Sequence, residues 1–178
     1  IYADVGDLAF TAAAPRLAVA HGGVRLELLL PGTVLILTGI GFKLALAPFH
    51  MWTPDVYEGA PAPVTAFVAT VSKGGMYALL LRFFSLSGAD RFPRLLLVLS
   101  IIAIASMLAG NLLALFSTNV KRILAYSSIA HMGYLLVAVE VSSRLGITAA
   151  AFYLVAYFIM ILGAFGVVTV LSSGERDA

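Results

Sequence analysis

Residues 28 to 84 read LLLPGTVLILTGIGFKLALAPFHMWTPDVYEGAPAPVTAFVATVSKGGMYALLLRFF, and this stretch decides the fold. It consists of two long apolar segments joined by a short turn rich in proline and glycine, Gly59 to Pro63. Each apolar segment contains one lysine, Lys43 in the first and Lys73 in the second. At ~1.5 Å of rise per helical residue, the two lysines lie roughly 22 Å and roughly 14 Å from the start of their segments. Both are therefore expected near the middle of a hydrocarbon layer that is about 30 Å thick.

A lysine at that depth is costly. Insertion scales put the cost at about 2.5 to 3.5 kcal/mol, and an ionisable group inside a membrane indicates a functional site by default. The sequence repeats this cost in adjacent segments, so we predict that Lys43 and Lys73 are functional. The simpler alternatives are that Lys43 extends its side chain to the membrane surface and that Lys73 belongs to a satisfied buried ion pair.

The composition is that of an integral membrane protein. Of the 178 residues, 61% are hydrophobic and 11% are charged, with a mean hydropathy of +1.03. Soluble domains contain about 25% charged residues. The net charge of only +2 gives no reason to expect a nucleic-acid partner, and the lipid bilayer is the expected surrounding. Without cysteine, the chain has no disulfide, thiolate metal site or cysteine nucleophile.

The pattern predicts an all-α, polytopic bundle of about five membrane-spanning helices. We place the bundle at residues 28–171, after an extramembrane connection or the end of a preceding helix at 1–27 and before a polar tail at 172–178. The chain does not begin with Met and has no signal peptide, so it is expected to be a fragment of a longer membrane protein. The predicted spans are about 28–59, 64–84, 95–116, 123–141 and 147–171.

The first predicted span is too long for one straight crossing and contains Pro48 and Pro54. Proline removes a backbone donor and clashes with the preceding helical turn. We therefore predict a discontinuous helix that breaks at Pro48, with Lys43 just before the break; a kink that serves packing alone is the alternative. After the break, aromatic residues such as Tyr57 suit the membrane interface, and Asp55 and Glu58 are expected to be solvated loop acids.

Two later spans have polar stripes along one face. The stripe on the second span indicates that Lys73 faces other helices or a hydrated cavity. The stripe on the fourth span contains His131, a possible relay group, although an ordinary core hydrogen bond is the simpler role for it. On the third span, Ser106 and Gly110 permit close helix approach. The first stripe is Thr65, Ala69, Lys73 and Tyr77, and the second is Ser127, His131, Tyr134 and Ala138.

Three segments together resemble the subunit N family of respiratory complex I, the antiporter-like, proton-pumping membrane subunits of NADH:quinone oxidoreductase. They are GFKLALAPFHMWTPDVYEGAPAPV, ATVSK and NVKRILAYSSIAHMGYLLVA. The resemblance covers about Leu28 to Ser173, and the long PFHMWTPDVYEGAPAPV segment is its most specific part. No P-loop, dinucleotide fingerprint, zinc-ligand spacing or catalytic triad accompanies it, so we predict no catalytic, cofactor-binding or metal-ligating residue on this chain.

The resemblance implies a fold of about fourteen transmembrane helices, of which this chain would cover the seventh to the eleventh. It implies that Lys43 and Lys73 belong to a chain of hydrated, charged groups that translocates protons along the membrane centre. A glutamate partner of Lys43 and a further lysine would lie outside this sequence. NADH, FMN, iron–sulfur clusters and quinone would be bound by other subunits. The implied partners are other membrane subunits of the complex, including neighbouring antiporter-like ones, in a bacterial inner membrane.

Two other functions remain open from the residues alone: a cation/proton antiporter subunit of the same superfamily, and a membrane scaffold that translocates nothing. The orientation also has two candidates. The segments 1–27, 82–94 and 142–146 are expected on one side of the membrane, and together they contain six arginines. This excess of arginine favours a cytoplasmic location for that side. The resemblance instead implies that the turn from Gly59 to Pro63 faces the cytoplasm.

Overall fold

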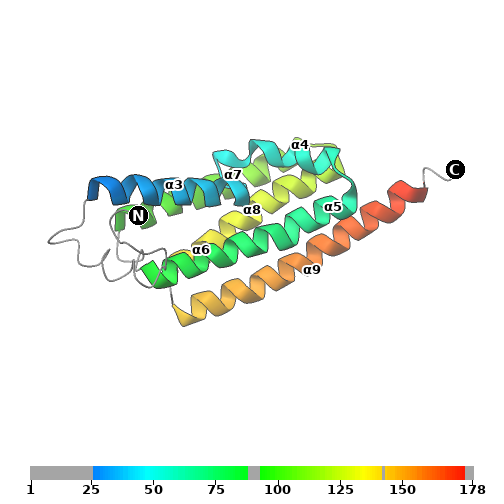
Figure 1. Ribbon diagram of the computed structural model, residues 1–178. Coiled ribbons are helices and arrows are strands. Elements are labelled where there is room, and N and C mark those ends of the chain that lie inside the picture. Colours follow the sequence, from blue (N-terminus) through cyan, green and yellow to red (C-terminus); the bar gives the residue numbers. More distant parts are fainter. Residues whose placement is uncertain (1–25, 88–92, 142, 175–178) are drawn as a thin grey trace.

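The computed structural model describes residues 26–87, 93–141 and 143–174, and these residues form helices and short connections without a strand. Figure 1 shows the long helices running side by side along one direction. Five segments of the described chain are long and apolar enough to cross a membrane: Pro31–Gly59, Ala62–Ser85, Pro93–Leu115, Val120–Val141 and Leu145–Ser172. The predicted all-α bundle of five spans, with a discontinuous first span, is confirmed.

The first two spans are interrupted. The first consists of α3 (Leu26–Leu44), a single 3-10 turn η1 (Phe49–Met51) and α4 (Trp52–Gly59). The second consists of α5 (Ala62–Phe67), a π-helical turn η2 (Val68–Ser72) and α6 (Lys73–Ser87). The other three are continuous helices: α7 (Pro93–Leu115), α8 (Val120–Val141) and α9 (Arg144–Gly174).

The helix ends differ by a few residues from the predicted spans. The second and third spans begin at or just after prolines, Pro61 and Pro93, because proline is tolerated in a first helical turn. At the other end, α9 continues to Gly174, into the predicted polar tail of 172–178. Of the predicted connection at 1–27, residues 1–25 lie outside the described residues, and α3 begins at Leu26.

The most extensive helix contact joins α7 and α8. Small side chains on α7 permit it: Ala103, Ser106 and Gly110 are all buried. A Cβ atom added to Gly110 would lie 2.6 Å from the backbone nitrogen of Ala130 on α8. On α8, a Cβ at Gly133 would lie 2.9 Å from the carbonyl oxygen of Ala103. Because lipid is as apolar as the side chains, such close packing is what holds membrane helices together.

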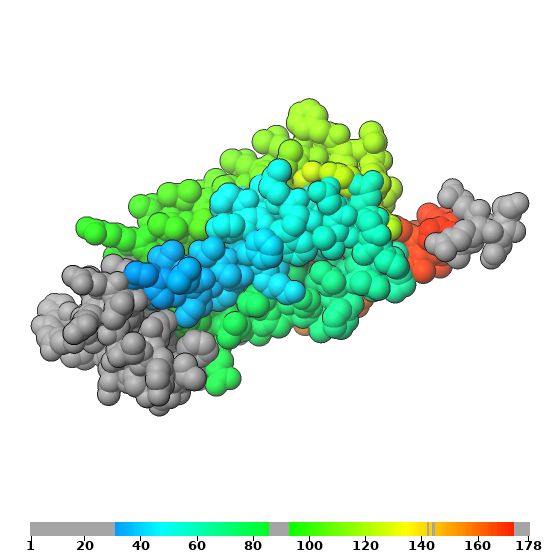
Figure 2. Space-filling view, turned by 45° about the horizontal axis from the view of Figure 1, so that its top comes forward, coloured from blue at the N-terminus to red at the C-terminus, as the bar shows by residue number. Residues whose placement is uncertain are grey.

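The other helices arrange themselves around this pair. The segment from α3 to α4 lies across one face of the bundle (Figure 2), with α3 against α6 and α4 against α8. The last helix, α9, packs against α5, η2 and α8. As a result, the inner faces of α4, η2–α6, α8 and α9 meet around the first residue of α6, Lys73.

The close approach of α7 and α8 predicts the effect of a larger side chain at Gly110. Gly110→Val should destabilise the bundle by about 1 to 3 kcal/mol, since the two nearest atoms in its way belong to backbone and the third is the Cβ of Ala130, none of which can rotate aside. Thermal unfolding of the purified protein in detergent measures this. The matched control is Gly163→Val on α9, where an added Cβ meets no atom within 4 Å. Equal loss of stability in both variants would contradict the packing described here.

Candidate functional site

The helix break begins directly after Leu44, one residue beyond Lys43. The last residue of α3 is Leu44, which lies four positions before Pro48, and the ring of a proline clashes with the carbonyl group four residues earlier. The next residue, Ala45, has a φ of 61°, a left-handed conformation that is costly for a residue with a Cβ atom. The irregular stretch therefore runs from Ala45 to the predicted proline, Pro48, and the last helical residue lies four residues before that proline.

The backbone groups freed by the break have partners inside the protein. The amide of Ala47 donates to the hydroxyl oxygen of Ser106 on α7, at 2.9 Å. The carbonyl oxygen of Phe42 accepts from the amide of Ala45 at 3.1 Å and from the indole of Trp52 at 3.1 Å. A non-helical backbone at membrane depth requires such partners, because hydrocarbon offers none. Ser106 therefore has two roles: its small side chain permits close helix packing, and its hydroxyl satisfies a backbone amide of the break.

Lys43 lies in the last turn of α3, with its side chain on an exposed face of the described bundle. A helix carboxyl end is a favourable position for a cation, because the last carbonyl groups carry partial negative charge. The predicted site residue is therefore adjacent to the break, as expected, but faces away from the core that the described helices form.

Lys73 has the opposite environment, with only 1% of the residue exposed. Its ammonium nitrogen donates to the hydroxyl oxygen of Ser128 on α8, at 2.8 Å, and lies 5.7 Å from the centre of the Tyr57 ring on α4. In the part of the chain that the structure describes, the only carboxylate ion pairs are those of Arg122. Lys73 is therefore a buried amine whose described partners are a neutral hydroxyl and an aromatic ring.

The polar stripe predicted for the second span lies inside the bundle. Thr65, Ala69, Lys73 and Tyr77 are all buried, and the Tyr77 hydroxyl donates to the carbonyl oxygen of Leu135 at 2.8 Å. The π-helical turn η2 ends immediately before Lys73. The Tyr157 hydroxyl of α9 donates to the carbonyl oxygen of Ala69 in that turn, at 3.2 Å. Such π-helical turns occur frequently at functional sites.

His131 lies one helical turn after Ser128 on α8, so the two side chains share a face. Its Nδ1 is 2.6 Å from the hydroxyl oxygen of Tyr153 on α9, and its ring centre lies 5.3 Å from that of Tyr157. The structure thus brings His131 to the side of α8 that also contacts Lys73, and gives it the hydrogen bond that was the simpler prediction for it.

Two residues at the site were not predicted from the sequence. Ser128 contacts Lys73, whereas the expected stripe contained its neighbour Ser127. Tyr57 was expected to suit the membrane interface, and the structure buries it fully inside the bundle, in edge contact with Phe165 at 5.9 Å, because α4 packs on α8. The sequence features that point to these two residues are the serine pair in YSSIAH and a tyrosine between acidic residues. Neither feature specifies which residue of another helix lies opposite.

The acidic side chains near Tyr57 are exposed as expected, at 72% for Asp55 and 41% for Glu58, but their place in the fold differs from the expected loop. Asp55 and Glu58 belong to α4, not to a loop, and both pair with Arg122 in the first turn of α8. The guanidinium nitrogen lies 2.6 Å from the Glu58 carboxylate and 3.0 Å from that of Asp55. Lys121 adds a hydrogen bond to the carbonyl oxygen of Ala60, at 3.0 Å. These contacts hold the end of α4 against α8.

Known proteins give a consistent match. A family described as NADH:quinone oxidoreductase/Mrp antiporter, transmembrane, matches residues 1–177. NADH-quinone oxidoreductase subunit N of Nitrosospira multiformis is 58% identical over 98% of this chain and 34% of its own length. The same subunit of Methylococcus capsulatus is 53% identical over 100% of this chain and 36% of its own length. The chain thus spans about a third of the length of these relatives.

Solved structures resemble the fold as well. A chain of respiratory complex I from Thermus thermophilus with bound aureothin has a TM-score of 0.73 and 38% identity, over 94% of this chain and 34% of that one. A chain of the Mrp complex from Dietzia sp. DQ12-45-1b has a TM-score of 0.72 at 24% identity, over 88% of this chain and 31% of that one, and shares the fold. Because the family match covers almost every residue, the chain belongs to the NADH:quinone oxidoreductase/Mrp antiporter transmembrane family.

Proposed function

We propose that this chain works within a proton-translocating, antiporter-like membrane subunit of respiratory complex I, with Lys73 as a proton carrier. The observation that carries the proposal is the environment of Lys73, buried beside the Ser128 hydroxyl. Burial disfavours the charged form of an amine, whereas a nearby carboxylate favours it. Since no described carboxylate pairs with Lys73, it is suited to alternate between ammonium and neutral amine.

Lys43 would be the neighbouring carrier. It lies next to the helix break on an exposed face, where a carboxylate from another part of the subunit would meet it. Gain and loss of that partner would drive the proton on and off Lys43. Two cations in one apolar layer repel each other, so a proton arriving at one lysine favours release from the other. His131, with Tyr153 and Tyr157 around it, would extend the hydrated path from Lys73.

The rest of the complex supplies what this chain lacks. The electron transfer that drives translocation, with NADH, FMN, iron–sulfur clusters and quinone, would take place on other subunits. The chain's apolar spans would sit in a bacterial inner membrane beside further membrane subunits, including other antiporter-like ones. The support for this assignment over a cation/proton antiporter is the identity of 53% and 58% to the two subunit N relatives.

The proposal predicts that Lys73→Met, which keeps the length of the side chain and removes the amine, lowers proton pumping by at least about tenfold, since proton-transfer groups typically contribute about 10²- to 10⁴-fold. Pumping is measured as acidification or dye response on NADH oxidation in vesicles that contain the assembled complex. Lys121→Met is the matched control, because Lys121 lies in the first turn of α8, outside the buried site. Normal pumping with both Lys43 and Lys73 replaced would establish the scaffold alternative instead.

A second prediction concerns Ser128. Ser128→Ala removes the hydroxyl partner of Lys73, and loss of a hydrogen bond to a charged group costs about 1.5 to 3 kcal/mol. Pumping should therefore slow by roughly tenfold or more, while the complex still assembles. Ser127→Ala, one position away on a different face of α8, is the control. If the two alanine variants pump equally well, Ser128 has no part in proton transfer.

A further inference from the structure

A carboxylic acid side chain is packed between α7 and α8, and the lysine mechanism does not use it. Glu140, in the last turn of α8, accepts a hydrogen bond from the hydroxyl of Ser100 on α7, at 2.7 Å through Oε2. Its other oxygen, Oε1, is buried and has no hydrogen-bond partner among the described residues. Ser100 lies seven residues into α7, or about 10 Å from the start of the helix. A buried carboxylate oxygen without a partner is unusual in a native structure and calls for an explanation.

The position of Glu140 relates it to Lys73 through α8. The Ser128 partner of Lys73 lies twelve residues earlier on the same helix, or about 18 Å along it. Tyr77, one turn after Lys73, bonds the carbonyl oxygen of Leu135, which lies between the two sites. Glu140 therefore lies near the end of the bundle where α6 and α8 end and α7 begins (Figure 1), opposite the end that holds the turn between α4 and α5.

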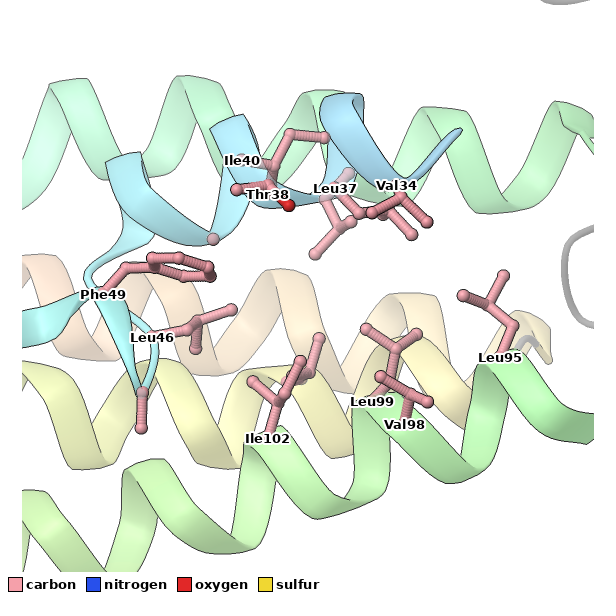
Figure 3. A pocket seen from close by; sticks show the side chains of 14 residues that line it. Val34, Leu37, Thr38, Ile40, Leu46, Phe49, Leu95, Val98, Leu99 and Ile102 are labelled. Carbon is pink, nitrogen blue, oxygen red and sulfur yellow. The ribbon is translucent and has the colours of Figure 1, made fainter. Parts of the chain in front are cut away.

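A cavity lies alongside these groups, bounded mostly by α3, the helix break and α7, and neither Lys73 nor Glu140 is among its lining residues. Its volume is about 200 Å³, and its walls include Leu80 of α6, Leu99 of α7 and Leu136 of α8. Leu99 precedes Ser100, and Leu136 lies one turn before Glu140 on the same face of α8. Figure 3 shows side chains of α3, the break and α7 pointing into the cavity. One water needs about 10 to 15 Å³, so the volume suffices for several waters, although an apolar wall keeps such a cavity dry at rest.

We propose that Glu140 is the group through which the Lys73 site exchanges protons with the water at this end of the bundle, and that transient waters between α6, α7 and α8, where these helices border the cavity, connect the two. The step rests on the proposed function of Lys73. The Lys73 ammonium passes a proton along transient waters to the Glu140 carboxylate, which leaves a neutral amine and a carboxylic acid. The acid then releases the proton to bulk water, and uptake follows the reverse course. Between transfers the dry, apolar wall prevents proton leakage, as hydrophobic constrictions do in channels.

The competing explanation is that Glu140 only accepts the hydrogen bond of Ser100. Two variants separate the explanations. Glu140→Gln keeps the size and the acceptor oxygen for Ser100 but holds no exchangeable proton, and it should lower pumping by at least about tenfold. Ser100→Ala keeps the acid and removes its partner, so it should lower pumping less than Glu140→Gln does. Glu140→Asp, which keeps the acid, should restore most of the pumping.

Pumping by Glu140→Gln at the normal rate, while Lys73→Met is inactive, would overturn this inference and leave the lysine mechanism intact. Normal pumping by both variants would instead overturn the proposed function. If the complex with Glu140→Gln fails to assemble, chemical labelling of the unmodified complex tests the inference instead. Dicyclohexylcarbodiimide adds to protonated carboxylic acids in apolar surroundings and should label Glu140, as read by mass spectrometry of the peptide. An unlabelled Glu140 after complete reaction would contradict the inference.

Discussion

The contact between the Lys73 ammonium and the Ser128 hydroxyl is the constraint on which the rest of the site depends. A charged amine buried in an apolar layer needs compensation, and the described helices offer it one hydroxyl and one aromatic face. Both come from other elements, Ser128 from α8 and Tyr57 from α4. The packing of α4 and α8 around α6 therefore determines the free-energy balance between the protonated and the neutral lysine.

The helix break helps to form the lysine site. The break changes the course of the first span, so that α4 lies against α8 and buries Tyr57 beside Lys73. Ser106 stabilises the break by accepting a hydrogen bond from the Ala47 amide. Arg122 fixes the far end of α4 through ion pairs with Glu58 and Asp55. A change in the charge of Lys43, one residue before Leu44, would act on the same segment that positions Tyr57. Under the proposed function, this shared segment would couple the charges of the two lysines.

Much of the fold followed from the sequence because the signals were strong and local. Apolar length fixed five spans, and the rule that a proline clashes with the carbonyl four residues before it accounts for a helix that ends at Leu44. The spacing of Thr65, Ala69, Lys73 and Tyr77 correctly placed all four side chains inside the bundle. Each of these properties depends on residues within one segment.

The partners across helices did not follow from the sequence. Ser127 and Ser128 are adjacent and equally polar, so only the rotation of α8 against α6 determines which of them meets Lys73. Tyrosine is a typical residue of membrane interfaces, and the burial of Tyr57 results from the way α4 packs on α8 after the break. The hydrogen bond between Glu140 and Ser100 could not be predicted either, because it depends on the close approach of α7 and α8 at Gly110 and Gly133.

The central claim is that Lys73 changes its protonation state while the protein works. Nitrogen-15 NMR of the complex, with lysine labelled at Nζ and the Lys73 signal assigned by its loss in Lys73→Met, tests this directly. The account predicts that the Lys73 signal moves between the positions of an ammonium and of a neutral amine when NADH oxidation is started and stopped. A Lys73 signal that stays at the ammonium position in every state would contradict it.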